Sequence, residues 1–368
     1  MKVLWAVCVC FYSSCTFASF GLNPIPEDHL KSNTEVLTVT NMPRTRSQDS
    51  LGICYSFVAT TILDEAYCVE NKIADCTNAT DTQKHSVLDS TRYTVKGPSA
   101  TEYAGEKDNR DYLWGINEGG SPQFVLHRAL QNWTVNEACA PFDQLVSKIP
   151  DAKKASELEY AMWKTFKDAY KTYQKKSKSC PKCGLEYATA KAEELKRNYG
   201  LKTSNQEILE AFSMETYAIF LDRLLIPYES CLDHQLEPLS KWELQQFPTK
   251  KKSNYSETIS KVKEVLAKKR PIAMSFCTQN ELKVKSIKAC LELKDKNGNP
   301  AGLGHGVVIK GYRKVCKSPG DCYDAVQVQN SWGESWQKAN SDGWVDAKVL
   351  LDRSFYELGA LTWIEKSN

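Results

Sequence analysis

The sequence is poor in net charge, in histidine and in long apolar segments. Its 48 basic and 45 acidic residues give a formal net charge of +3 over 368 residues, which gives no reason to expect a nucleic-acid partner. Beyond the N-terminal residues no segment is long and apolar enough to span a membrane, and there are no internal repeats. The sequence contains only five histidines, so there are few candidates for a catalytic imidazole. A chain of this length can bury one large core and a smaller satellite.

The first 18 residues have the composition of a secretory signal peptide. Lys2 precedes the apolar stretch 3–11, and small residues follow up to Ala18. We therefore predict cleavage near residue 18 and a secreted or extracytoplasmic protein. Residues 12–15 also resemble a bacterial lipoprotein box, but a tyrosine stands where an aliphatic residue is usual, so secretion is the preferred interpretation.

The cysteine count fits an exported protein with one free thiol. Three of the 14 cysteines lie in residues 1–18, and setting Cys54 apart leaves ten, enough for five disulfides. Short separations predict the pairs Cys68–Cys76, Cys277–Cys290 and Cys316–Cys322. The sequence does not pair Cys139, Cys180, Cys183 and Cys231. One alternative is a zinc site made by Cys180, Cys183, Cys231 and His234; because export favours disulfides, no metal or cofactor is expected.

Cys54 has the sequence context of a nucleophile. Phe57, Val58 and Ile62 recur after it at helical spacing, which places Cys54 in the first turn of a helix. There the unpaired N–H groups and the helix dipole favour the thiolate. Gln48, six residues earlier, can bring its side-chain amide beside the Cys54 backbone N–H, so that both donate to the oxyanion of a tetrahedral intermediate.

One histidine has the setting that a cysteine nucleophile needs. His305 lies between two glycines at the start of the apolar run 307–309, a pattern typical of the mouth of a buried strand. The alternating segment 325–329 predicts a second strand that ends at Asn330. The side chain of Asn330 can accept a hydrogen bond from the imidazole and fix its tautomer, and Trp332 can shield that bond from water.

Four separated blocks resemble the papain-like cysteine proteases. They are residues 48–57, similar to QGSCGSCWAF; 118–122, similar to the CNGG segment; 270–276, similar to the strand GPVSVAI; and 304–307 with 330–333 and 342–345, similar to NHAV and NSWG…GY. The resemblance implies an α+β, two-lobed papain-like fold. Its helical left lobe would begin with the Cys54 helix, and its right lobe of antiparallel strands would carry His305 and Asn330.

The resemblance also implies substrate-binding residues and exposes two departures. Gly119 and Gly120 would pair with the substrate backbone. Ser121, Ser275 and Gly306 would line a roomy pocket for the second residue before the scissile bond, which suggests bulky apolar side chains there. Two cysteines that the family joins by a disulfide are replaced by Leu51 and Asn117, and the tryptophan after the nucleophile is Tyr55. Because both disulfide partners are missing together, the loss of one bridge is the simpler interpretation.

The spacing predicts an insertion. His305 follows Cys54 by far more than the roughly 130–150 residues usual in papain-like proteases. We assign the extra residues to a helical insertion at about 151–250 within a peptidase domain of residues 19–368. One amphipathic helix carries residues 158–173, and a second opens with the capping box Ser204–Glu207 and continues through Leu224. The insertion either decorates the core or forms a lid over the cleft.

We therefore expect a secreted thiol endopeptidase that acts on peptide or protein substrates through Cys54, His305, Asn330 and Gln48. The alternatives are an amidase or transpeptidase with the same residues, and a binding or adhesion protein with an occluded cleft. Only about thirty residues separate the predicted cleavage from Gln48, too few for a long pro-segment. Latency would then come from the insertion, from an inhibitor protein as a second partner, or from cellular routing.

Overall fold

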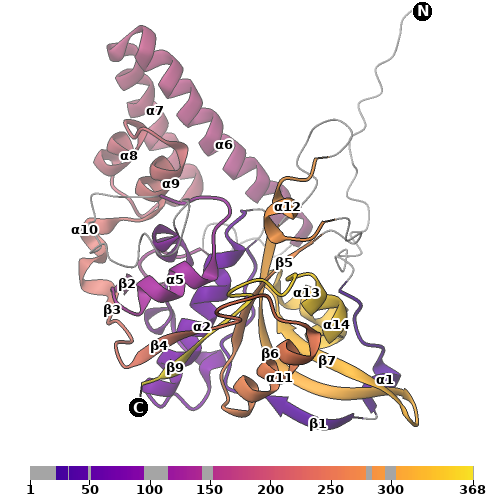
Figure 1. The fold of residues 1–368 in the computed structure, drawn as a ribbon. Coiled ribbons are helices and arrows are strands. Elements are labelled where there is room, and N and C mark those ends of the chain that lie inside the picture. The colour runs from indigo at the N-terminus through magenta and orange to yellow at the C-terminus, as the bar shows by residue number, and fades with distance from the viewer. Residues whose placement is uncertain are drawn as a thin grey trace, which may run out of the picture.

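The computed structural model describes residues 22–31, 33–48, 51–94, 115–142, 152–278, 284–294 and 304–367. Helix α2 (Cys54–Glu70) and the short helix α5 (Pro122–Ala129) lie together on one side, and the long antiparallel strands, with further helices around them, lie on the other (Figure 1). Further helices project upward from the first side. The predicted α+β class is confirmed. The predicted signal peptide, residues 1–18, lies outside the described residues.

Seven strands of the described chain form one antiparallel sheet, in the order β4-β9-β5-β6-β7-β8 with β1 paired to β6. Their bounds are β1 (Asn33–Thr38), β4 (Trp242–Phe247), β5 (Ile272–Cys277), β6 (Gly304–Ser318), β7 (Asp321–Gln329), β8 (Trp344–Asp346) and β9 (Leu361–Lys366). Strand β6 contacts both α2 and α11 (Tyr255–Ala267). For this reason the consecutive residues Val307, Val308 and Ile309 are all buried, instead of alternating with exposed ones.

Helix α2 begins at Cys54, as predicted, and most of its residues are buried, including two carboxylates. Asp64 accepts hydrogen bonds from the backbone N–H and the ring of His85, both at 2.8 Å, and its carboxylate lies 3.5 Å from the guanidinium of Arg46. Glu65 pairs with Arg270 at 3.1 Å. Buried charges are tolerated where they are paired and hydrogen-bonded, so these contacts let α2 pass through the core.

Short helices surround α2 and the sheet. They are α1 (Glu27–Lys31), α3 (Val87–Ser90), α5 (Pro122–Ala129), α10 (Tyr228–Cys231), α12 (Ile287–Leu291), α13 (Gly333–Ala339) and α14 (Ala347–Asp352). Two short strands, β2 (Thr134–Val135) and β3 (Gln235–Leu236), pair separately.

The helical projection contains α6 (Ala152–Ser179), α7 (Pro181–Tyr199), α8 (Asn205–Phe212) and α9 (Tyr217–Leu225). The apolar stripe of α6 is buried at Met162, Phe166 and Ala169, as its periodicity predicts. These residues belong to the same cluster of buried apolar side chains as α2 and β6. The projection therefore shares a continuous core with the rest of the molecule.

The second predicted helix of this segment is wrong in extent. The capping box is present, since Ser204 accepts from the Glu207 backbone N–H at 3.1 Å and Glu207 accepts from the Ser204 backbone N–H at 2.6 Å. However, the helix stops at Phe212, and Thr216 caps a new helix by accepting from the Ile219 backbone N–H at 3.2 Å. The apolar spacing suggested one continuous helix, but the side-chain cap at Thr216 begins a second one.

The end of the predicted insertion contains a strand. Residues 242–247 form β4, which pairs along its whole length with β9. The predicted insertion at about 151–250 includes the sequence WELQQF, yet β4 is an edge of the main sheet. The division into a peptidase domain and an insertion remains a prediction.

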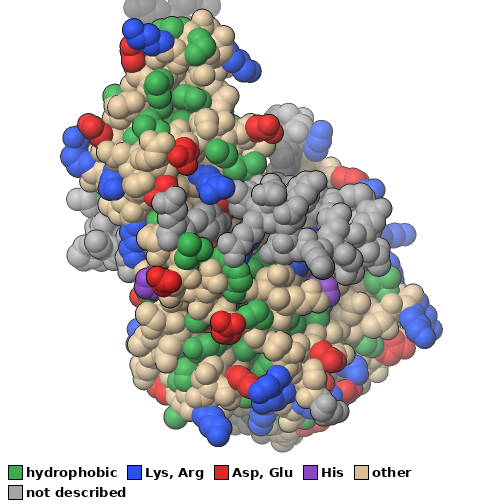
Figure 2. All heavy atoms as spheres, turned by 90° about the vertical axis from the view of Figure 1, so that its left-hand side faces the viewer, with side chains coloured by type: hydrophobic (Ala, Val, Ile, Leu, Met, Phe, Trp, Pro, Cys, Tyr) green, Lys and Arg blue, Asp and Glu red, His purple; other side chains and the backbone are tan. Residues whose placement is uncertain are grey.

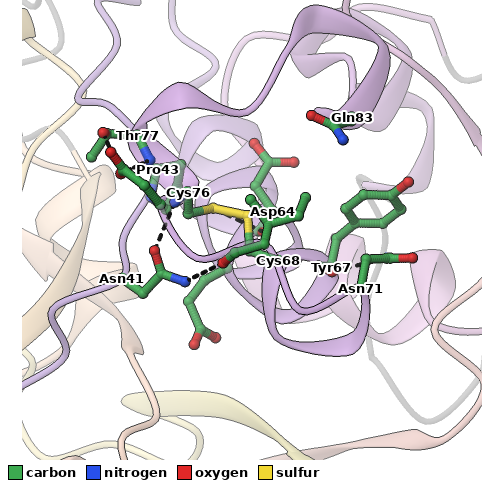
Figure 3. Close-up of a disulfide and its surroundings, with 12 residues drawn as sticks. Asn41, Pro43, Asp64, Tyr67, Cys68, Asn71, Cys76, Thr77 and Gln83 are labelled. Atoms are coloured by element: carbon green, nitrogen blue, oxygen red, sulfur yellow. Dashed lines mark hydrogen bonds between the residues drawn. A yellow bond between two sulfur atoms is a disulfide. The ribbon is translucent and has the colours of Figure 1, made fainter.

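The three predicted disulfides are confirmed. Cys68–Cys76, Cys277–Cys290 and Cys316–Cys322 are bonded, and so are Cys139–Cys231 and Cys180–Cys183. Figure 3 shows the first of these beside Asn41. The side chain of Asn41 donates to the Ile73 carbonyl at 2.9 Å and accepts from the Cys76 backbone N–H at 2.7 Å, so the short loop is held by both covalent and hydrogen bonds.

The zinc alternative is wrong, because two disulfides use the thiols that it required. Cys180 and Cys183 bond to each other, and Cys231 bonds to Cys139 across 92 residues. The latter bridge joins the segment after β2 to helix α10, at the base of the projection. It therefore links the segment that enters the helical projection to the segment that leaves it.

Among the described residues no helix has the length and apolarity needed to cross a membrane. Figure 2 shows the face of the molecule that carries the projection, and basic and acidic side chains are interspersed over it. This distribution fits the small net charge of the sequence.

Candidate active site

Cys54 is the one free cysteine among the described residues, and it is half-buried at the N-terminus of α2. Burial raises the pKa of the Cys54 thiol, and the backbone N–H groups of Gly306, Tyr55 and Cys54 itself, which face its sulfur, partly oppose that shift. The contact with Gly306 places the sulfur beside the residue that follows His305. Cys54 and the start of β6 therefore meet, although 251 residues separate Cys54 from His305.

His305 is buried at the start of β6 and is held on two sides. One ring nitrogen, Nε2, lies 2.8 Å from Oδ1 of Asn330. The indole of Trp332 stacks on the imidazole, with centroids 4.4 Å apart and planes 17° from parallel. Burial lowers the pKa of His305 to about 4, and the hydrogen bond to Asn330 opposes that shift. The structure thus brings together the three residues of the predicted His305, Asn330 and Trp332 arrangement.

Electrostatics at the site favour a neutral resting pair. Burial raises the pKa of the Cys54 thiol and lowers that of the His305 imidazole, because each charged form loses hydration. A thiolate formed by proton transfer to the imidazole would face an opposite charge and the N–H groups around the sulfur, which favour it. Burial thus favours a neutral thiol and a neutral imidazole as the resting forms.

Asn330 is positioned by a residue that sequence reasoning missed. It follows β7, and its backbone N–H donates to Oε1 of Gln337 at 3.1 Å. The amide nitrogen of Gln337 in turn donates to the Val328 carbonyl at 2.8 Å. Gln337 is buried on α13 and clamps the end of the strand. Its position seven residues after Asn330, on a short helix, carried no recognisable motif.

Gln48 takes part in four hydrogen bonds, one of which its backbone carbonyl accepts from the Leu51 backbone N–H at 3.2 Å. Its backbone N–H donates to the Ser331 carbonyl at 2.7 Å, and its side-chain Oε1 accepts from the Ser331 hydroxyl at 2.5 Å. Its Nε2 donates one hydrogen to the Leu51 carbonyl at 3.0 Å, and the amide has a second hydrogen to give. Ser331 was present in the resembling NSWG block, but only the structure shows that it orients Gln48.

The glycine segment, residues 118–122, lies against the loop before Cys54. The Gly119 backbone N–H donates to the Gly52 carbonyl at 2.7 Å. A Cβ on Gly120 would lie 2.3 Å from the hydroxyl of Thr94 and 2.9 Å from the Tyr55 ring, so only glycine fits. Both glycines are exposed and available to a substrate strand.

At the place where papain-like cysteine proteases have a disulfide, hydrogen bonds hold this chain. The Tyr55 hydroxyl donates to the Asn117 carbonyl at 2.8 Å, and Leu51 is buried in the core. Together with the bond between Gly119 and Gly52, these contacts fix the glycine segment without a bridge. The loss of both cysteines therefore leaves the segment anchored.

The expected pocket residues are placed as follows. Ser275 and Gly306 are direct partners across β5 and β6, so they share one face of the sheet. A Cβ on Gly306 would lie 3.2 Å from Val58 and 4.0 Å from Pro122. Ser121 precedes Pro122 at the start of α5, and its backbone N–H donates to the Thr94 hydroxyl at 3.2 Å.

Helix α9 supports the glycine segment, a contact that the sequence did not suggest. The Ile116 backbone N–H donates to the Ala218 carbonyl at 2.9 Å. Gly115 has a positive φ of 69°, and a Cβ there would lie 2.3 Å from the carbonyl carbon of Ala218. The helical projection thus touches the segment that leads into Gly119 and Gly120.

No protein-family model and no curated protein matches the sequence. Solved structures of cysteine proteases are similar to the chain at low identity. Procathepsin B S9 from Trypanosoma congolense is 11% identical, with 94% of this chain and 82% of that chain covered and a TM-score of 0.40. Xylellain, a cysteine protease from Xylella fastidiosa, is 12% identical over 94% and 91%, with a TM-score of 0.39. SERA5E from Plasmodium falciparum is 13% identical over 88% and 89%, with a TM-score of 0.36.

Proposed function

We propose that this protein is a secreted thiol peptidase that hydrolyses peptide bonds through an acyl-enzyme intermediate. The proposal is supported by contacts between distant segments: the Gly306 backbone N–H faces the free thiol of Cys54, the neighbouring His305 bonds to Asn330, and Ser331 bonds to the amide of Gln48. A nucleophile, a base, an orienting group and an oxyanion donor are the parts that acyl transfer needs.

In the acylation step, the His305 imidazole accepts the proton of Cys54, and the sulfur attacks the carbonyl carbon of a peptide. The oxyanion that forms accepts hydrogen bonds from the free N–H of the Gln48 amide and from the Cys54 backbone. The latter lies in the first turn of α2, where N–H groups have no partner within the helix. His305 then gives its proton to the leaving amine as the carbon–nitrogen bond breaks.

In the deacylation step, neutral His305 takes a proton from water, and the resulting hydroxide attacks the thioester. The oxyanion is held by the same two donors. Collapse of the second tetrahedral intermediate breaks the carbon–sulfur bond, releases the carboxylic acid and returns the proton to sulfur. Asn330 and the stacked indole of Trp332 keep the ring of His305 in one orientation through both steps.

Substrate would bind as an extended strand along the exposed Gly119–Gly120 backbone. The pocket for the second residue before the scissile bond would lie between Ser121, Ser275 and Gly306, with Val58 and Pro122 as apolar neighbours. Such surroundings favour an apolar side chain. The five disulfides support an oxidising compartment, and hence secretion.

The test is hydrolysis of a library of peptides of different lengths with unblocked termini. Mass spectrometry identifies the cleavage sites. The wild-type protein should cleave internal bonds, and Cys54→Ala should not. Release of free amino acids or dipeptides only would instead indicate exopeptidase action. Cleavage that persists in Cys54→Ala would exclude the proposed nucleophile.

A further inference from the structure

The rim of the glycine segment carries a carboxylate next to the nucleophile loop. Glu118 is exposed and directly precedes Gly119. A Cβ on Gly52 would lie 3.2 Å from Cβ and 3.5 Å from Cγ of Glu118, so the Glu118 side chain covers Gly52. Gly52 is two residues before Cys54, and its Cα is therefore at most about 7 Å from that of Cys54.

We infer that Glu118 selects peptides with lysine or arginine immediately before the scissile bond. This inference rests on the proposed function, and it names the substrate class of the same site. The residue before the scissile bond carries the carbonyl that Cys54 attacks. A strand that places this carbonyl at Cys54 and continues along Gly119 and Gly120 must carry that residue past Gly52.

Lysine and arginine have the length to make this contact. Their apolar stems can lie along the Gly52 backbone while the charged end reaches the carboxylate. Arginine can also bind a carboxylate with two parallel hydrogen bonds. A neutral side chain of the same shape would leave the carboxylate without a charged partner, so the carboxylate discriminates by charge.

Two observations support a negative potential at this rim. In the described part of the chain, no lysine or arginine forms an ion pair with Glu118. Tyr217, at the start of α9, has its pKa raised by burial and then by the negative charges of Glu118 and Asp168. Asp168 is itself paired with Lys164 at 2.8 Å, so of these two carboxylates Glu118 is the one without a lysine partner in the described chain.

The contact also gives the helical projection a role in specificity. Helix α9 holds residues 115 and 116 through the bond between Ile116 and Ala218, two residues before Glu118. The position of the carboxylate over Gly52 therefore depends on the projection. This is a positioning role for α9, exerted through the backbone of residues 115 and 116.

The experiment compares two internally quenched peptides that differ only in having arginine or its neutral isostere citrulline before the scissile bond. The wild-type protein should show a higher kcat/KM for arginine by about fivefold, the size expected for one partly exposed ion pair. In Glu118→Gln the ratio should fall to near one. The control variant is Glu186→Gln, which neutralises an exposed carboxylate on α7, and it should keep the wild-type ratio.

Salt and an inactive variant separate this inference from the proposed function. The ratio should decline as ionic strength rises, because an exposed pair is screened. Binding of the same two peptides to Cys54→Ala should show the same preference in Kd, whether or not the native protein turns them over. Equal kcat/KM or equal Kd for arginine and citrulline, or an unchanged ratio in Glu118→Gln, would overturn the role of Glu118. Absence of hydrolysis with a retained binding preference would overturn the proposed chemistry alone.

Discussion

The hydroxyl of Ser331 donates to the side-chain oxygen of Gln48 at 2.5 Å, and this bond fixes the orientation of the Gln48 amide. The same amide donates to the Leu51 carbonyl. Without Ser331 the amide could rotate and present its oxygen, instead of a donor, to the developing oxyanion. In the proposed mechanism, the oxyanion donor Gln48 is therefore oriented by a neighbouring residue, Ser331.

Replacing Ser331 by alanine should lower kcat by about tenfold with little change in KM, because the lost orientation acts on the transition state. Gln48→Ala should cost more, about 10²–10³ in kcat, since it removes one oxyanion donor outright. Steady-state kinetics on one peptide measures both. The double variant should be no slower than Gln48→Ala, since Ser331 acts through that amide. Additive losses would contradict this relationship.

His305 should make folding stability depend on pH. Burial lowers its pKa in the folded protein to about 4, whereas the unfolded chain takes up the proton near pH 6.5, at roughly the usual pKa. Between these values the unfolded state binds more protons, so this contribution is complete above about pH 6.5 and is lost as the pH falls toward 4. The loss amounts to about 3 kcal/mol.

Urea unfolding of the wild type and of His305→Gln at pH 7, 5.5 and 4 measures this contribution. The free energy of unfolding of the wild type, relative to that of His305→Gln, should fall steadily as the pH decreases over that range. Glu65, whose pKa is raised to about 7 by burial, titrates in both proteins and cancels in the comparison. A constant difference would contradict a buried, neutral imidazole.

Gly115 and Gly200 form a matched pair that tests the contact between α9 and the glycine segment. Both have positive φ, 69° and 61°, so alanine strains the backbone at either site by about 1 kcal/mol. Only at Gly115 would the new Cβ also meet the backbone of Ala218, at 2.3 Å, while nothing lies within 4 Å of a Cβ on Gly200.

Gly115→Ala should therefore lower the free energy of unfolding by about 1–3 kcal/mol more than Gly200→Ala, the range typical of overpacking, and it should also raise KM. Chemical denaturation and peptide kinetics on both variants provide the measurement. Equal losses of stability, with unchanged KM in both, would show that α9 does not position the segment.

The two disulfides that the sequence left unpaired should differ in their contribution to stability. Cys139–Cys231 closes 92 residues, and Cys180–Cys183 closes three. In the loop-entropy description, removing the first costs about 4–5 kcal/mol and removing the second about 2 kcal/mol. Paired Cys→Ala variants compared by urea unfolding test this order, and the reverse order would mean that loop closure does not dominate.

The site was more predictable than the helices around it. Cys54, His305 and Asn330 stand in short local patterns, a helix start and two strand ends, whose geometry follows from the neighbouring residues. Gln337 and Ser331 support the site through long-range hydrogen bonds, which no local periodicity encodes.

The projection shows the other limit of prediction. Its apolar spacing correctly indicated helices, but the break at Thr216 depended on one side-chain cap. Strand β4 depended on its partner β9, more than a hundred residues later in the chain. Cys139 and Cys231 likewise meet across 92 residues that contain the four helices of the projection.

Labelling of the native protein with an epoxysuccinyl thiol-protease probe, followed by peptide mass spectrometry, tests the central claim most directly. The account predicts stoichiometric modification at Cys54, with the ten disulfide-bonded cysteines of the described chain unmodified and labelling strongly slowed in His305→Ala. A folded protein whose Cys54 stays unlabelled, or is labelled equally fast without His305, would contradict an open site with an imidazole-activated thiol.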